Sequence, residues 1–329
     1  HPGAAADVGL CIVGTESGTD RARPIAIEVH ALTGLPAECS VFDVKHACYG
    51  ATAGLHMAFL WVAANPSRKA LVIAADIARY GIGSAAEPTQ GAGAVALLLG
   101  VADVDEALFA PWPMTGTHAA PVHDFWQPPY LREAVVRGRY SIECYLDSLA
   151  GAYAAWLRNG GPGEGSLDRL LFHSPFPGMA RKAHARLWEL SRGADASGAA
   201  DDFARRVAPG LAVNAGVGNC YAAAVYLSLA GLVEAEGASL PGRCLGGFSY
   251  GSGSCGEFFG GRFGRRAAAG RVGLAEALAA RETIDVAGYE RARAECEALE
   301  HDGSFREDRT GAVGRFTFLG IRDHVRVYR

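Results

Sequence analysis

Cys48 is the residue whose type and position could begin covalent chemistry. It lies where an expected strand, Ser40–Val44, ends and an expected helix, Ala47–Ala64, begins. A thiol at a helix start faces backbone N–H groups and the positive end of the helix dipole, which lower its pKa and can stabilise the oxyanion formed in acyl transfer. A buried cysteine can also be a small apolar core residue. That second interpretation is kept for the other cysteines: Cys11, Cys39, Cys144, Cys220, Cys244, Cys255 and Cys296.

Other polar residues also stand where expected strands end or helices begin. Glu16 follows Gly14-Thr15, and His173 follows an apolar strand and precedes Ser174-Pro175. Asn219 opens a helix, and Ser252 lies in the glycine-rich run Ser249–Gly253. Sites in open α/β sheets assemble at strand ends, so these side chains could meet. Each also has an ordinary alternative: a turn carboxylate, a structural histidine, a helix N-cap and a tight loop.

Strands and helices alternate along both halves of the chain, as in βαβ units. The first half is predicted to contain strands at Val8–Val13, Ser40–Val44, Ala70–Ala75 and Ala92–Leu99, with the helix Ala47–Ala64 between the second and third. The second half is predicted to contain strands at Leu170–Phe172, Leu211–Val213 and Arg243–Tyr250 and helices at Gly178–Ser191 and Asn219–Glu236. The pattern predicts a layered α/β fold.

Two segments are similar to each other and indicate an internal duplication. ACYGATAGL from Ala47 and NCYAAAVYL from Asn219 each open a helix rich in small residues between expected strands. We therefore predict two halves, 1–165 and 166–329. A Pro-rich and aromatic-rich stretch near 101–141 reads as an irregular surface insertion in the first half. The run Gly314–Tyr328 is expected to be one strand, or a hairpin about Gly320, that closes the second sheet.

Composition excludes several classes of protein. The chain has 329 residues, 50% of them hydrophobic and 20% charged, which is typical of a globular protein with a large core. The net charge of −4 lacks the basic excess of a nucleic-acid binder. The cysteines show no CxxC spacing, so we expect a reducing, cytoplasmic setting and no metal site. Charged residues and glycines interrupt the apolar runs, so no membrane partner is expected.

A resemblance covers nearly the whole chain. HACYGATAGLHMAFLWV, ALVIAADIARYGIGSAAEPTQGAGAVALLLG, FHSPF, GNCYAAAVYLSLAGL and FSYGSG resemble the 3-hydroxy-3-methylglutaryl (HMG) synthases of the thiolase superfamily, in the same order and at similar spacing. The resemblance implies a five-layer αβαβα fold from two similar halves, usually in a homodimer. Members of the family begin with a further strand, helix and loop region ahead of GTES, so the first half is expected to lack its N-terminal elements in this sequence.

The resemblance also implies roles for residues. Cys48 matches the acylated nucleophile, Glu16 the general acid/base, and His173 the imidazole that polarises the acceptor. The matched substrate-binding positions are Asn219, Ser252, Asp76, Thr89, Ser141, Lys182 and Tyr49. The implied reaction joins an acetyl group on Cys48 to the β-keto carbon of an acceptor thioester, and water then hydrolyses the bond to Cys48. It needs no metal or redox cofactor.

Gly178 departs from the members of the family that use coenzyme A (CoA), which carry a lysine five residues after the catalytic histidine. Lys182 matches a second such lysine. A missing cation weakens phosphate recognition. Together with the segments PFPGMARKAH and SYGSGSCGEFF, the missing lysine makes the chain resemble the polyketide β-branching members of the family. In those members, donor and acceptor acyl carrier proteins (ACPs) hold both thioesters.

Three alternatives remain open at this point. The first is a mevalonate-pathway synthase that uses acetyl-CoA and acetoacetyl-CoA, and basic residues around the pocket would favour it. The second is a ketosynthase of the same superfamily, against which Glu16 argues, because decarboxylative condensation needs no carboxylate base. The third is a non-catalytic scaffold that retains the fold.

Overall fold

The chain divides into two compact units, residues 1–274 and 275–329. The computed structural model describes residues 5–131, 133–270, 272–299, 305–306 and 316–328. The side chain of Cys296 and positions 314–315 of the predicted C-terminal strand lie outside the described residues. The larger unit contains both sheets expected from the sequence and all the candidate site residues.

The first sheet has the strand order β2-β1-β3-β4. Its strands are β1 (Val8–Gly14), β2 (Ser40–Val44), β3 (Lys69–Ile77) and β4 (Ala92–Leu99). β1 is parallel to β2 and β3, whereas β4 is antiparallel to β3. Leu10 and Ile12 point to one face and pack with α2 (Gly50–Ala64). Cys11 and Val13 point to the other face and pack with α1 (Ile25–Thr33). The continuous apolar run of β1 therefore fills two cores.

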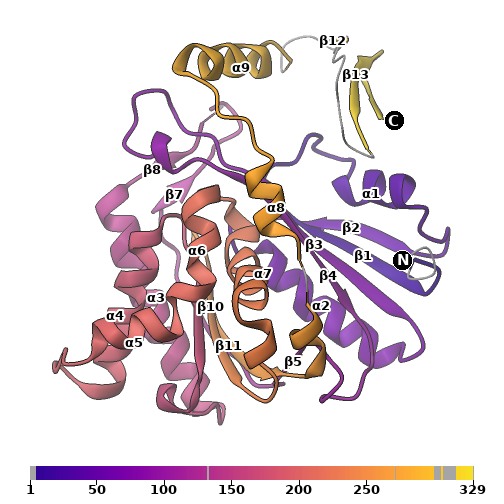
Figure 1. Cartoon of the computed structure of the whole chain (residues 1–329). Helices are drawn as coiled ribbons and strands as arrows, with labels where there is room; N and C mark the ends of the chain where they lie inside the picture. Colours follow the sequence, from indigo (N-terminus) through magenta and orange to yellow (C-terminus); the bar gives the residue numbers. More distant parts are fainter. Residues whose placement is uncertain (1–4, 132, 271, 300–304, 307–315, 329) are drawn as a thin grey trace. The chain divides into compact units, whose positions relative to one another are not determined.

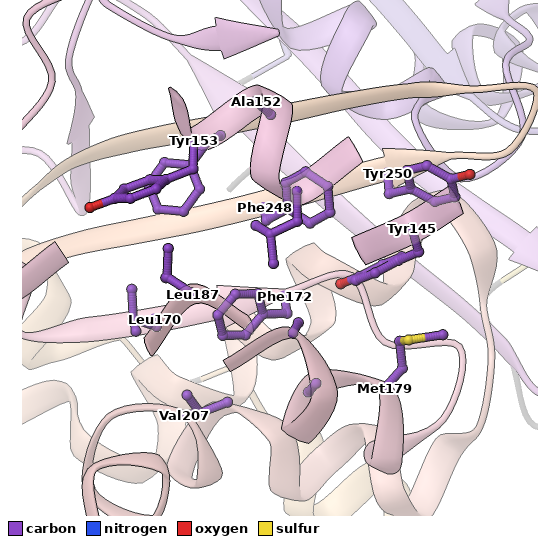
Figure 2. Packing of buried hydrophobic residues seen from close by; sticks show 14 of the residues in the cluster. Tyr145, Ala152, Tyr153, Leu170, Phe172, Met179, Leu187, Val207, Phe248 and Tyr250 are labelled. Atoms are coloured by element: carbon purple, nitrogen blue, oxygen red, sulfur yellow. The ribbon is translucent and has the colours of Figure 1, made fainter. Parts of the chain in front are cut away.

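The second sheet has the order β5-β11-β10-β9, with β6 also paired to β11. Its strands are β5 (Phe109–Pro111), β6 (Gly116–Ala119), β9 (Arg169–Phe172), β10 (Cys244–Gly251) and β11 (Cys255–Phe263). Leu171 packs with α7 (Ala224–Glu236) on one face. Leu170 and Phe172 point to the opposite face, into a core shared with α3 (Gly138–Arg158) and α4 (Pro177–Arg192). Figure 2 shows this aromatic core around Phe172, Phe248 and Tyr145.

These contacts arrange the larger unit in five layers (Figure 1). Helix α1 covers the outer face of the first sheet, α2 and α7 lie between the sheets, and α3 covers the outer face of the second. The duplication is visible in the strand pairing. A parallel pair followed by an antiparallel strand occurs as β1, β3 and β4 and again as β9, β10 and β11, with α2 and α7 as the corresponding crossover helices.

Three expectations from the sequence are wrong in detail. Leu211–Val213 is not a strand but lies in α6 (Ala208–Val217), after α5 (Ala199–Arg206). A short apolar run fits either periodicity, and Pro209 in the first turn favours a helix here. The segment 101–141 is not merely an irregular insertion, because β5 and β6 complete the second sheet. The small hairpin of β7 (Phe125–Trp126) and β8 (Val135–Val136) follows them.

The third correction concerns the C-terminal hairpin. β13 (Phe318–Arg322) and β14 (Val325–Tyr328) turn at Asp323 and His324, not at Gly320. They form a separate sheet with β12 (Phe305–Arg306) and do not close the second sheet. The smaller unit also contains α9 (Val286–Leu299), while α8 (Leu274–Ala279) spans the division between the units.

The apolar helical stretch 47–64 has the length and composition of a membrane span. Within the fold it is a core helix, since Ala51 packs in the cluster around α7 and Ala58 packs with β1 and β3. Small residues on its first turns allow this close approach.

Gly14 provides a test of the close approach between β1 and α2. An added Cβ at Gly14 would lie 2.3 Å from the Cα atom of Ala51, so the backbone of β1 or α2 would have to move. We expect Gly14→Ala to lower the free energy of unfolding by about 1–3 kcal/mol. Gly18→Ala is the matched control, because its nearest atom would be 3.8 Å away. Equal midpoints for the two variants in urea denaturation would contradict the expectation.

Candidate active site

A cavity of ≈ 530 Å³ collects residues from both halves of the duplicated fold. Cys48 comes from the first half, and His173, Asn219 and Ser252 come from the second. Thr89 and Ser141 also line it. Most of its remaining wall is apolar or aromatic and includes Tyr80, Phe125, Ile142, Tyr145, Phe176, Met179, Tyr221 and Tyr250. The cavity therefore suits a mostly apolar acyl chain with a few fixed polar contacts.

Cys48 lies in the turn between β2 and α2 and is 8% exposed. Ala47 before it has a φ of 39°, a conformation rare outside glycine, and the Tyr49 N–H bonds to the His46 carbonyl. Burial raises the pKa of the Cys48 thiol, and the nearby charges of Glu16 and Asp76 raise it further. The lowering expected from the helix start is therefore outweighed, and the thiol is protonated at neutral pH.

Glu16 lies just beyond β1 and is partly buried, with its Oε1 atom buried and without a hydrogen-bond partner. Burial, followed by the charge of Asp76, raises the pKa of Glu16 to about 8. Its charge raises the pKa of the Cys48 thiol, although Glu16 itself does not line the cavity. A carboxyl group with a pKa near neutrality suits general acid/base catalysis.

Asp76, at the end of β3, is 3% exposed and does not line the cavity. Its carboxylate accepts hydrogen bonds from the Thr15 hydroxyl, the Glu16 N–H, the Ser17 N–H and hydroxyl, and the Ala222 N–H. Asp76 therefore fixes the backbone of Glu16 and joins it to the second half.

His173 follows β9 directly and is 3% exposed. Its backbone carbonyl accepts the Tyr145 hydroxyl at 2.8 Å, and its N–H bonds to the Phe248 carbonyl. Burial lowers the pKa of His173 to about 3, so the imidazole is neutral. Its Nδ1 atom is buried without a hydrogen-bond partner.

Asn219 is held from three sides. Its N–H bonds to the Thr89 carbonyl, its Nδ2 donates to the Tyr80 hydroxyl at 2.8 Å, and its Oδ1 accepts the Tyr221 N–H. Gly218 before it has a φ of 87°, and a Cβ there would lie 2.3 Å from the Gln90 carbonyl oxygen. The close approach of the two backbones therefore requires glycine at 218.

Asp124 is a site residue that the sequence reasoning missed. It is fully buried and accepts the Tyr250 hydroxyl at 2.7 Å, the Gly253 N–H at 3.0 Å and the Ser141 hydroxyl at 3.5 Å. It therefore ties the turn that carries Ser252 to the start of α3. Its segment, HDFW, was interpreted only as surface insertion. The lining residues Tyr80, Tyr145 and Tyr221 were missed too, since nothing in a tyrosine's sequence context separates a cavity wall from a core.

Besides Asp76, two predicted substrate-binding residues, Tyr49 and Lys182, lie outside the cavity lining. The Tyr49 hydroxyl donates to Glu257 at 2.7 Å, and burial raises its pKa. Lys182 lies on α4 and is exposed. In the described part of the chain, no three His, Cys, Asp or Glu side chains are grouped so that they could hold a metal ion.

The cavity brings a thiol together with a neutral imidazole. The Glu16 carboxyl, which does not line the cavity, can exchange a proton near neutral pH. Solved structures share this architecture. The chain matches "MvaS in complex with 3-hydroxy-3-methylglutaryl coenzyme A" with a TM-score of 0.86 and 39% identity, covering 98% of this chain and 82% of that one. It matches the HMG synthase of the curacin biosynthetic pathway in complex with acetyl donor-ACP with a TM-score of 0.92 and 32% identity, covering 99% and 83%. The fold is thiolase-like, and the chain is an acyl-condensing, carbon–carbon bond-forming enzyme.

Sequence comparison narrows this class. The family model for the N-terminal part of hydroxymethylglutaryl-coenzyme A synthase matches residues 4–103, and the model for the C-terminal part matches 112–197 and 194–307. Hydroxymethylglutaryl-CoA synthase of Enterococcus faecalis is 34% identical over 324 residues, or 98% of this chain and 82% of the relative. The polyketide 3-hydroxy-3-methylglutaryl-ACP synthase PksG of Bacillus subtilis is 35% identical over 272 residues, or 77% and 63%. The chain belongs to the hydroxymethylglutaryl-coenzyme A synthase family.

The raised pKa of Glu16 has a consequence for stability that can be measured. The folded state holds the Glu16 proton up to about pH 8, whereas the unfolded chain releases it near pH 4.5, so Glu16 destabilises the fold progressively as pH rises between these values. We expect Glu16→Gln to melt at the wild-type temperature near pH 4.5 and at a higher temperature at pH 8. A difference in melting temperature that does not vary with pH would contradict the burial of this carboxyl.

Proposed function

We propose that this chain condenses an acetyl group carried on Cys48 with the β-keto carbon of a β-ketoacyl thioester, both delivered by acyl carrier proteins, as in polyketide β-branching. The observation that carries the proposal is the cavity that unites Cys48, His173 and Asn219, with the charge of Glu16 acting on the thiol. The same proposal includes donor and acceptor carrier proteins as partners and a second copy of the chain in a homodimer. It also includes a cytoplasmic setting and a reaction without a cofactor.

Acetyl transfer is the first step. The Cys48 sulfur bonds to the acetyl carbon, the carbon–sulfur bond of the donor thioester breaks, and the thiol proton leaves with the donor thiolate. The acyl-enzyme intermediate lets the donor depart before the acceptor enters. Because burial keeps the thiol protonated, proton removal must accompany the attack, and the departing donor sulfur takes that proton.

Condensation is the second step. The Glu16 carboxylate removes a proton from the acetyl methyl, and the resulting enolate carbon bonds to the β-keto carbon of the acceptor. The neutral His173 imidazole donates a hydrogen bond to the former keto oxygen as charge develops. The proton taken up by Glu16 then passes to that oxygen, which becomes a hydroxyl. Water then cleaves the thioester to Cys48, which regains its proton and releases a carboxylate.

Gly178 supports carriers over CoA. It lies in the first turn of α4, beside the lining residues Pro175, Phe176 and Met179. An added Cβ there would lie 3.0 Å from the Phe176 ring, so a lysine at this position would have to displace that ring slightly. The relative solved with acetyl donor-ACP has the same fold at a TM-score of 0.92.

A second candidate is condensation of the CoA thioesters, acetyl-CoA and acetoacetyl-CoA. Its support is the match to the E. faecalis enzyme over 98% of this chain, together with Lys182, which is exposed on α4 and could meet phosphate.

Competition between acetyl donors distinguishes the carrier-protein candidate from the CoA candidate. We expect acetyl carrier protein to acetylate Cys48 at least about tenfold faster than acetyl-CoA at equal concentration, because a carrier adds protein–protein contacts that CoA lacks. Mass spectrometry of the intact protein gives the rate, with Cys48→Ser as the negative control and Cys244→Ser as a matched cysteine control. Activity confined to CoA thioesters would favour the second candidate.

Glu16→Gln separates the two steps. We expect the variant to accumulate acetyl-Cys48 while condensation falls about 10²–10⁴-fold, since the general base is lost. In the wild type, the condensation rate should rise with pH until about 8, where Glu16 becomes ionised. A variant that condenses at the wild-type rate would exclude Glu16 as the base.

A further inference from the structure

Glu257 is a buried carboxylate that the proposed reaction does not use. It lies on β11 in the second half and is 2% exposed. Both of its oxygens bind side chains of α2, in the first half. Oε2 accepts the Tyr49 hydroxyl at 2.7 Å, and Oε1 lies 2.6 Å from His56 Nε2. A buried charge with fixed partners on another element restrains the position of that element.

The bonded residues share one face of α2 near its start. Thr52, between Tyr49 and His56, donates to the Ser249 hydroxyl at 2.7 Å, and Ser249 is the register partner of Glu257 on β10. Positions 49, 52 and 56 follow the i, i+3, i+7 spacing of a single helix face. The β10–β11 hairpin thus holds the first two turns of α2 through one row of polar bonds.

The same hairpin holds the turn that carries Cys48. A Cβ at Gly251 would lie 2.6 Å from the Tyr49 Cβ and 2.8 Å from the His46 carbonyl oxygen, so the two backbones are in direct contact there. Tyr49 is the residue after Cys48 and the cap of α2. Displacement of Tyr49 therefore moves Cys48 relative to His173 and Asn219.

His56 extends this contact to the surface. Its side chain is 42% exposed, while that of Glu257 is 3% exposed, so the pair runs from solvent into the boundary between the halves. The hydrogen bond that Glu257 accepts raises the pKa of His56. Tyr226 on α7 and Cys255 on β11 are the other titratable groups that feel the Glu257 charge.

We propose that Glu257 is a positioning residue for acetyl transfer: by binding Tyr49 and His56 it fixes the Cys48 turn of the first half against the second half of the site. This role rests on the proposed use of Cys48 as the acyl carrier. Glu257 does not line the cavity, so it acts through Tyr49 and not on the substrate.

Single-turnover acetylation of the full protein tests the role, with acetyl carrier protein and acetyl-CoA as the probes. Glu257→Leu should lower the maximal rate of Cys48 acetylation about 10–100-fold, because small displacements of a nucleophile are costly, while the donor concentration at half-maximal rate changes less than about twofold. Glu257→Gln keeps an acceptor for Tyr49 and should restore most of the rate. Tyr49→Phe removes only the hydroxyl and should be slowed like Glu257→Leu. If Glu257→Leu does not fold, the acetylation rate of Tyr49→Phe decides whether the bond between Tyr49 and Glu257 positions Cys48.

Glu236→Leu is the matched control, since it removes a carboxylate paired with Arg169 in the same half, away from the Cys48 turn. Its maximal rate, corrected for the folded fraction by circular dichroism, should equal that of the wild type. Wild-type rates in Tyr49→Phe and Glu257→Leu, or equal slowing in Glu236→Leu, would overturn the positioning role alone. Absence of acetyl-Cys48 in the wild type would instead overturn the proposed function, and the role with it.

Discussion

The carboxylate of Asp76 joins the parts of the molecule on which the site depends. It collects N–H and hydroxyl donors from residues 15–17 with one oxygen and the Ala222 N–H with the other. Burial raises its pKa, and the donors oppose that shift, so its charge is maintained by hydrogen bonds from two chain segments that are distant in sequence. The first of these segments carries Glu16, and the second follows Asn219. A catalytic constellation divided between two sheets needs such a connection, because neither sheet alone fixes the distance between its members.

The charge of Asp76 also influences the chemistry. Burial has the largest effect on the pKa values of Cys48, Glu16 and His173, and it favours the neutral form of each. The negative charge of Asp76 adds to the upward shift of both Cys48 and Glu16. These three candidate residues are thus close to uncharged. A site of this kind suits apolar acyl chains, with charge that develops only when bonds begin to change.

The sequence predicted that Cys48 and His173 would lie close together, and both line the cavity. Both follow strands, and strand ends can be recognised from apolar runs that stop at polar or small residues. The strand Ser40–Val44 was predicted with its bounds confirmed, and Ala92–Leu99 likewise. Asp124 could not be found in this way, because its importance comes from Tyr250 and Gly253, more than a hundred residues later. Leu211–Val213 shows the other limit, since three apolar residues carry no periodicity that separates a strand from a helix. The thiol pKa was misjudged because a helix start is a local feature, whereas burial depends on the whole fold.

The second sheet is assembled out of sequence order. β5 and β6, at 109–119, pair with β11, at 255–263, and β9 joins through β10, at 244–251. During synthesis, the segment 109–119 must wait for more than a hundred later residues before its edge is paired. Contacts of such long sequence separation form slowly and leave unpaired strand edges exposed in the meantime. On the ribosome the nascent chain therefore carries Cys48 and Glu16 well before the strands that complete their cavity exist, and chaperone dependence would concentrate in that interval.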